Sequence, residues 1–445
     1  MNRSTTHSRL RVELLEDRQL LAGDVDVFAI GNVLHVRGDG LDNGLAITST
    51  SEGVLEVSGL NQGGAVTTIN GLASQPFIRI KEIIISLGEG NDALVATRMP
   101  LSGSMSIQMG QGNDFVGLGE FDNNSLVDSA VNSLLDALVI STNLAIDTGE
   151  GNDIVAGRNV STKALVLTTL GGDDVITLDH QGNPGDPNHV PGITASAGLA
   201  INAGEGTNIV TLSGLNIMSL TVTGGAVQDT VTVEKATIAK GANIQAKDGA
   251  NLVTLEEVTS KSLHVSAGLG NDTVTLEQVT CSKRISLSDN YGNDLFDLED
   301  VAARSLGISA GFGADTISLE DVTTTQSIRI DSGDGEDEVT LKDIIAKSLA
   351  TALGDGADEL SLDNVAATKK VIIGGGIGND TPELKRVSAA ALEILLAAGD
   401  DEISLETVLV SGKTRIDGGQ DTNVYTDMGG NSLPILERTN FQTIV

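Results

Sequence analysis

Short stretches of alternating apolar and polar residues recur along most of the chain. The alternation is clear in Val274-Thr275-Leu276, Ile317-Ser318-Leu319, Val339-Thr340-Leu341 and Ile403-Ser404-Leu405. A period of two places the apolar side chains on one face of a β-strand and the hydroxyls on the other. A polar corner such as Glu320-Asp321 follows, and a second alternating stretch such as 327–330 comes after it. The pattern predicts two short strands per repeat, with no room for a helix.

A glycine-rich turn separates the repeats and fixes their length. Its last Asp or Asn lies in successive copies at Asn208, Asp229, Asn251, Asp272, Asp294, Asp315, Asp337, Asp358, Asp380 and Asp401, at intervals that alternate between 21 and 22 residues. Such regularity is typical of a solenoid. We therefore predict an all-β fold, a single-stranded parallel β-helix (β-solenoid) of 21–22 residues per coil. About 15 coils, stacked at roughly 4.8 Å, would make a rod on the order of 70 Å long. A leucine-rich repeat shares the period, but it would need an Asn ladder and a helical return, which the sequence does not show.

The breaks in the period define the predicted organisation of the chain. We expect a leader or tail at 1–23, an N-terminal cap with degenerate first coils at 24–86, the solenoid at 87–428 and a C-terminal cap at 429–445. Apolar residues recur at helical spacing after Asn123-Asn124, which predicts one short helical insertion at about 119–143. A segment rich in Pro and His at about 179–192 predicts a protruding loop.

The first 23 residues contain Leu14-Leu15-Glu16-Asp17-Arg18-Gln19-Leu20-Leu21 behind three arginines. This segment resembles the LEPR-x-LL leader of large bacterial envelope-associated proteins, although Asp17 stands where that leader has proline. The resemblance implies an extracellular or cell-surface location. A short amphipathic or disordered tail is the alternative.

The charge of the chain limits its partners. The sequence has 61 acidic and 27 basic residues, a net charge of −34, and only 2% aromatic residues. Electrostatic repulsion argues against binding to nucleic acid, and no apolar stretch is long enough for a membrane-spanning helix. Divalent cations are the expected small partners, and a cell-surface polysaccharide or protein is the expected large one.

The turns suggest how cations would bind. Gly-x-Gly-x-Asp, as in Gly88-Glu89-Gly90-Asn91-Asp92, resembles the repeats of the RTX or hemolysin-type calcium-binding family. That resemblance implies Ca²⁺ as the cofactor, with aspartate ligands at Asp92, Asp114, Asp153, Asp272, Asp315, Asp337, Asp358 and Asp380. The family repeats its motif every nine residues, whereas this chain repeats it every 21 or 22, so at most one side of the coil could bind calcium. A purely structural turn, in which Gly supplies positive φ and Asp caps the backbone, is equally open.

Two classes of function compete. The uniform repeat, the acidity and the lack of a catalytic motif favour a secreted or cell-surface structural protein, adhesin-like and stabilised by calcium, that is not an enzyme. The alternative is a carbohydrate-active parallel β-helix of the polysaccharide lyase or hydrolase type. Such an enzyme would normally need a groove lined with aromatic and basic residues, and both kinds of residue are scarce here.

Overall fold

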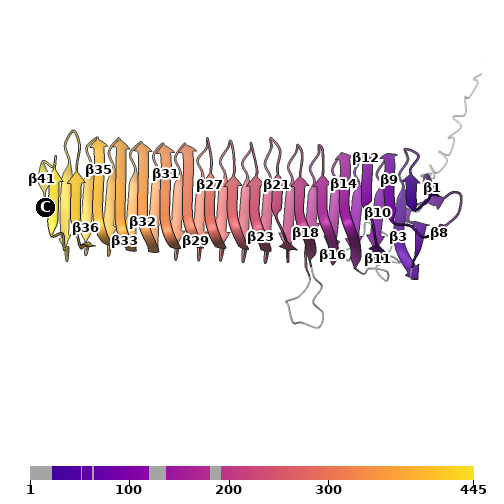
Figure 1. Ribbon diagram of the computed structural model, residues 1–445. Coiled ribbons are helices and arrows are strands. Elements are labelled where there is room, and N and C mark those ends of the chain that lie inside the picture. The colour runs from indigo at the N-terminus through magenta and orange to yellow at the C-terminus, as the bar shows by residue number, and fades with distance from the viewer. Residues whose placement is uncertain (1–22, 52, 63–64, 120–136, 181–191) are drawn as a thin grey trace, which may run out of the picture.

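The structure is a computed structural model that describes residues 23–51, 53–62, 65–119, 137–180 and 192–445. The described residues form one straight rod of about 15 turns, with strand β1 (Asp24–Ile30) near one end of the rod and β41 (Thr443–Ile444) at the other (Figure 1). The predicted all-β parallel solenoid is confirmed. The described residues contain strands and turns but no helix, so the leucine-rich repeat interpretation is wrong.

Antiparallel strands cover the N-terminal end of the rod. The strands here are β1 (Asp24–Ile30), β2 (Val33–Arg37), β3 (Gly44–Ser51), β4 (Val54–Gly59), β5 (Asn61–Gln62), β6 (Ala65–Val66), β7 (Thr68–Ile69) and β8 (Ser74–Ile78). β1 pairs antiparallel with β2, and β4 pairs antiparallel with both β3 and β8. β2 and β3 also pair in parallel with the first regular strands, β9 and β10, and so join this end to the solenoid.

The solenoid begins with β9 (Glu82–Glu89), and its strands form two rows. One row, which follows the turns, comprises β10 (Ala93–Thr97), β13 (Phe115–Gly119), β15 (Ile154–Arg158), β17 (Val175–Leu178), β19 (Ile209–Ser213), β22 (Thr230–Glu234), β24 (Leu252–Glu256), β26 (Thr273–Glu277), β28 (Leu295–Glu299), β30 (Thr316–Glu320), the start of β32 (Glu338–Asp355), the start of β33 (Glu359–Ile377), β34 (Thr381–Lys385), β36 (Glu402–Glu406), β39 (Val424–Gly429) and β41 (Thr443–Ile444).

The other row leads into the turns. It comprises β9, β11 (Met99–Leu101), β12 (Met105–Gln111), β14 (Leu138–Glu150), β16 (Val160–Thr168), β18 (Ile193–Asn202), β20 (Asn216–Ile217), β21 (Leu220–Thr223), β23 (Thr237–Gln245), β25 (Thr259–Ser266), β27 (Thr280–Ser288), β29 (Ala302–Phe312), β31 (Thr323–Asp334), the ends of β32 and β33, β35 (Ser388–Ala398), β37 (Leu409–Val410), β38 (Lys413–Asp417) and β40 (Ile435–Thr439). β40 and β41 continue the parallel pairing within 429–445.

The strands stack in register, so equivalent residues of successive coils lie directly above one another. Val253, Val274 and Phe296 form one such column and are buried. Their polar neighbours Thr254 and Thr275 lie on the outer side of the strand. The core is thus a thin layer of Val, Ile, Leu and Ala between the two strand rows, and burying each large aliphatic side chain stabilises the rod by about 1.5–3 kcal/mol.

Each coil turns its corner through a residue with left-handed backbone conformation. Glu257, Gln278, Asp300, Asp321, Asp343 and Asn364 occupy this place in six successive coils, with φ between 52° and 56°. The residues before it form a second, largely acidic column, in which Glu320, Lys342 and Asp363 stack in register. Lys342 forms an ion pair with Glu320, so lysines partly neutralise this exposed column.

The predicted helical insertion needs correction. Residues 120–136, which hold most of it, lie outside the described residues, but both ends of the predicted range are strand. Gly119 ends β13, and Leu138 begins β14. Leu138 and Ile140 are buried at alternate positions and pair with β11 and β16, so stacking in the solenoid overrides the helical spacing there. The leader at 1–22 and residues 181–191 of the Pro/His loop also lie outside the described residues.

Candidate functional site

One buried column of Asp and Asn side chains runs through the turns along the rod. We call it the aspartate column; its members are Asn43, Asp92, Asp114, Asp153, Asp174, Asn208, Asp229, Asn251, Asp272, Asp294, Asp315, Asp337, Asp358, Asp380, Asp401 and Asn423, each at most 2% exposed. The backbone N–H of each member donates to the Oδ1 atom of the next, as from Asp315 to Asp337 at 2.8 Å. These bonds run unbroken from Asn43 to Asn423 at 2.6–3.2 Å.

A second, exposed ladder explains the Asn that precedes Asp in the motif. The N–H of Asn113 donates to Oδ1 of Asn91, and the N–H of Asn152 donates to Oδ1 of Asn113, both at 2.8 Å. Here the later coil donates to the earlier one, opposite to the aspartate column. The Asn-Asp pair therefore connects each turn to both of its neighbours, which accounts for much of the motif without any ligand.

The second carboxylate oxygen of the aspartates lacks a hydrogen-bond partner. In eleven of the twelve aspartates of the column, Oδ2 is buried and accepts no hydrogen bond, the exception being Asp229, whose Oδ2 accepts from Gly225. An unpaired buried charge of this kind costs several kcal/mol unless it gains a proton or a cation.

The asparagines of the column show what surrounds that oxygen. Nδ2 of Asn251 donates to the backbone carbonyls of Lys247 and Gly249 at 3.1 Å. Nδ2 of Asn423 donates in the same way to Gly418 and Gln420. Since Asp and Asn have the same shape, Oδ2 of an aspartate faces backbone carbonyl oxygens at the equivalent place. A proton or a hard cation between these acceptors would satisfy them.

Burial raises the pKa of the aspartates in the column. It raises the pKa of Asp92, Asp114, Asp315 and Asp380 to about 7, although the hydrogen bond from the preceding backbone N–H opposes the shift. For Asp174, Asp294, Asp358 and Asp401, burial raises the pKa to about 6. Near neutral pH these carboxyls are therefore poised between protonation and cation binding.

All eight predicted calcium ligands lie in the aspartate column. Four further aspartates of the column were not among the predicted ligands, because their motifs lack one or both of the glycines or the Asn: Asp174, Asp229, Asp294 and Asp401. The carboxylates of the column face the interior and are shielded from solvent. The period identifies the column, but it does not show which way the side chains point.

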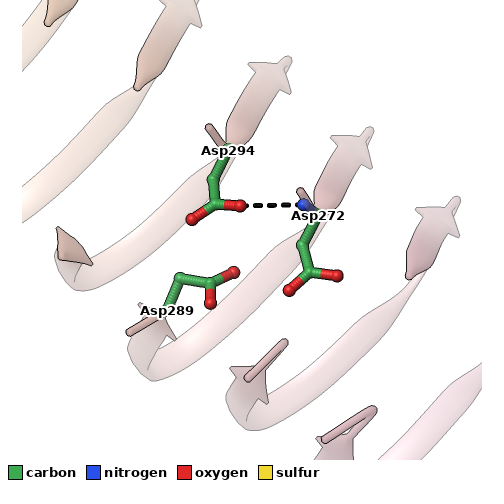
Figure 2. Close-up of side chains that lie close together, drawn as sticks. All are labelled: Asp272, Asp289 and Asp294. Carbon is green, nitrogen blue, oxygen red and sulfur yellow. Dashed lines mark hydrogen bonds between the residues drawn. The ribbon is translucent and has the colours of Figure 1, made fainter. Parts of the chain in front are cut away.

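One coil carries a third buried carboxylate. Asp289, at the end of β27, faces Asp272 and Asp294 of the column (Figure 2). One carboxylate oxygen from each residue can be chosen so that all three atoms lie within 4.8 Å of one another. Asp272 and Asp294 are 2% exposed, and Asp289 is 6% exposed. Sequence analysis overlooked Asp289. Its signal is a charged residue at the inward position that follows Ile285 and Leu287.

The described residues also bring together one Ser–His pair. Oγ of Ser213 lies 2.8 Å from Nδ1 of His180. A catalytic triad would need a carboxylate to orient the ring. The neighbouring Asp179 has both of its oxygens engaged by the Arg158 guanidinium at 2.8 Å. The pair is therefore accounted for as a polar contact at the base of the Pro/His loop.

Comparisons with known proteins add no assignment. In the part of the chain that the structure describes, no helix is long and apolar enough to cross a membrane. The chain matches no model of a known protein family and no curated protein.

Proposed function

We propose that the protein is a secreted or cell-surface structural rod, adhesin-like in role, whose turns take up calcium. The observation that carries this proposal is the aspartate column, with its continuous ladder of backbone-to-carboxylate bonds and eleven buried, unpartnered Oδ2 atoms. A stack of nearly identical coils presents long, regular faces, a geometry that suits display and multivalent attachment more than a single reaction centre. The expected partners are divalent cations and a surface polysaccharide or protein.

Calcium uptake follows from the chemistry of the turns. Oδ2 of an aspartate and the nearby backbone carbonyls form the all-oxygen environment that Ca²⁺ prefers. At pH 8 the aspartates whose pKa burial raises to about 6 or 7, such as Asp315 and Asp401, are ionised, and a bound cation would remove the cost of their buried charge. In the Asn turns the amide already occupies this place, so we expect calcium only where the column has aspartate.

We further infer that the protein is not an enzyme. The support comes from the sites that most resemble catalytic ones. Ser213 and His180 form a hydrogen-bonded pair, but both oxygens of the neighbouring Asp179 carboxylate accept from Arg158. A shallow groove of about 310 Å³ is lined by Glu338, Glu359, Glu383 and Glu402, but these residues bring no basic or aromatic group to bind a polysaccharide. Incubation with acidic polysaccharides tests this inference, and the appearance of new unsaturated or reducing ends would favour the carbohydrate-active alternative.

The calcium proposal is tested by thermal unfolding of the purified chain, followed by circular dichroism at pH 8. We expect a higher apparent midpoint in excess Ca²⁺ than in chelator, because each site filled at a hundred times its dissociation constant adds about 2.7 kcal/mol. Equilibrium dialysis should find several Ca²⁺ ions per chain. Mg²⁺ at equal ionic strength controls for screening. An unchanged midpoint would leave a purely structural turn.

The proposed location has its own test. Antibody labelling of intact producing cells, before and after treatment with an external protease, should detect the rod on the surface or in the medium. Labelling that appears only after cell lysis would contradict a secreted or surface role.

A further inference from the structure

The coil that carries Asp289 differs from its neighbours at a buried position. Ser266, Ser288 and Ser309 stack in register, so the residues that follow them, Ala267, Asp289 and Ala310, occupy equivalent places in three successive coils. Both alanines are fully buried, and Asp289 is 6% exposed. A carboxylate has thus replaced a methyl group in the interior, beside two carboxylates that the turns already supply. Such a replacement is strongly unfavourable unless the charge is compensated.

The hydrogen bonds of the cluster leave three oxygens free. Oδ1 of Asp289 accepts from the N–H groups of Gly268 and Asn290 at 3.1 and 2.8 Å. Oδ1 of Asp272 and of Asp294 each accept one backbone N–H in the ladder. The Oδ2 atoms of all three are buried and accept no hydrogen bond from a donor group, although the Asp272 and Asp289 carboxyls face one another closely enough to share a proton. No ion pair among the described residues brings a Lys or Arg to them.

We propose that Asp272, Asp289 and Asp294 bind a single hard divalent cation of the Ca²⁺ type between two coils. Three carboxylates from two structural columns converge on one point, whereas a regular turn supplies one carboxylate per coil. The oxygen-only donor set of three buried carboxylates favours Ca²⁺ over Mg²⁺, which keeps several of its waters and is usually held by only one or two carboxylates. The four N–H donors on the Oδ1 atoms share the charge that a dication would leave uncompensated.

This site goes beyond the proposed calcium uptake by the turns and does not depend on it. Asp289 comes from the end of a strand, outside the Gly-x-Gly-x-Asp motif, so the cluster stands even if no regular turn holds an ion. The rest of the column could equally be neutralised by protons, and the site would remain the one place among the described residues where three such carboxylates come together.

Tyr291 provides a local optical probe. It lies two residues after Asp289 and three before Asp294, the chain has only one other tyrosine, Tyr425 near the C-terminus, and it has no tryptophan. Terbium(III) replaces Ca²⁺ at oxygen sites and emits when a nearby tyrosine is excited. We expect sensitised emission from the full chain on titration with Tb³⁺, and Ca²⁺ should compete it away. Tyr291→Phe should abolish most of the emission without altering calcium binding.

Asp289→Ala is the decisive variant because it installs the residue of both neighbouring coils. We expect Tyr291-sensitised emission to fall at least about fivefold and calcium affinity at this site at least about tenfold, since even outer-shell groups of metal sites are worth that much. Asp289→Asn, which keeps the size but removes the charge, should behave alike. Asp297→Ser, which removes an exposed carboxylate from β28 and matches Ser318 of the next coil, should change neither quantity.

Thermal stability supplies an independent readout, because the difference between Asp289→Ala and the unmodified chain should reverse in sign between chelator and Ca²⁺. In chelator, Asp289→Ala should unfold at a higher temperature than the unmodified chain, because a buried carboxylate has been removed. In saturating Ca²⁺ the order should invert. Equal emission from the two proteins, or an Asp289→Ala chain that is the more stable in both conditions, would overturn the site. Several calcium ions per chain with no Tyr291 signal would support the turns and reject this cluster.

Discussion

At the scale of the residue, the turn aspartate does two jobs with its two oxygens. Oδ1 accepts the backbone N–H of the preceding coil, a role that Asn fills equally well. Oδ2 faces carbonyl oxygens and has no donor. The four asparagines of the column show the neutral solution to this conflict. An aspartate reaches the same neutral state only by binding a proton or a cation, so its neutralisation depends on pH and cation concentration, whereas that of asparagine does not.

Asp380→Asn tests this difference at one position. At pH 8 in chelator we expect the variant to be more stable by about 1–2 kcal/mol, because Nδ2 can donate to the turn carbonyls whereas the ionised Oδ2 cannot. At pH 5 the wild-type carboxyl, whose pKa burial raises to about 7, is protonated, and the gain should vanish. Urea unfolding at the two pH values measures it. Asp380→Ala is the control, since it also removes the charge but cannot donate to the turn carbonyls and loses the ladder bond, so it should be less stable than Asp380→Asn at both pH values. A gain that persists at pH 5 would contradict the protonation argument.

At the scale of the element, the turn is set by the contact between the backbones of successive coils. Gly333 and Gly354 stack in register with φ of 107° and 106°. A Cβ atom added to Gly354 would lie 1.6 Å from the carbonyl oxygen of Gly333. The glycines of the motif are therefore required by the close stacking of the turns, whether or not a cation binds.

Gly354→Ala should accordingly destabilise the rod by about 2–4 kcal/mol, because both the positive φ and the overlap force the backbone to move. Gly374 is the matched control: its φ is not positive, and an added Cβ would meet only the carbonyl oxygen of Thr351 at 3.9 Å. Gly374→Ala should change stability by less than about 1 kcal/mol. Urea unfolding at pH 5, where the column is largely protonated, compares the two. Similar losses in both variants would show that stacking is not the cause.

The same elements show how far the sequence alone leads. The 21- and 22-residue intervals, with alternating stretches such as Val274-Thr275-Leu276, were sufficient to predict the coil and its two strands. Helical spacing misled at Leu138, which belongs to a strand because the neighbouring coils supply its hydrogen bonds. Asp289 was overlooked because its importance depends on its closeness to two members of the aspartate column, Asp272 and Asp294, which no local pattern records.

At the scale of the whole molecule, the ionisation of each aspartate in the column is coupled to that of its neighbours along the rod. Their carboxylates follow one another from coil to coil, so each ionised member raises the pKa of its neighbours, as Asp358 and Asp401 do for Asp380 after the larger effect of burial. Protons or cations would therefore be taken up by the column as a connected set. The stiffness of the rod should depend on the medium, as would suit a protein outside the cell, where calcium is abundant.

The stability of the whole rod should consequently fall as the pH rises from 5 to 8 in chelator. The unfolded aspartates have a pKa near 3.9, whereas burial raises the pKa of the folded ones to about 6 or 7. The folded state therefore binds more protons in this interval, so the stabilisation is complete below pH 4 and is lost as the pH passes 6 to 7.

Each carboxyl contributes at most about 1.4 kcal/mol per pH unit. Apparent midpoints of urea unfolding at pH 5, 6, 7 and 8 measure the effect, and excess Ca²⁺ should flatten the profile, because a bound cation replaces the proton. A stability that rises with pH in chelator would mean that the column is ionised and satisfied by other means.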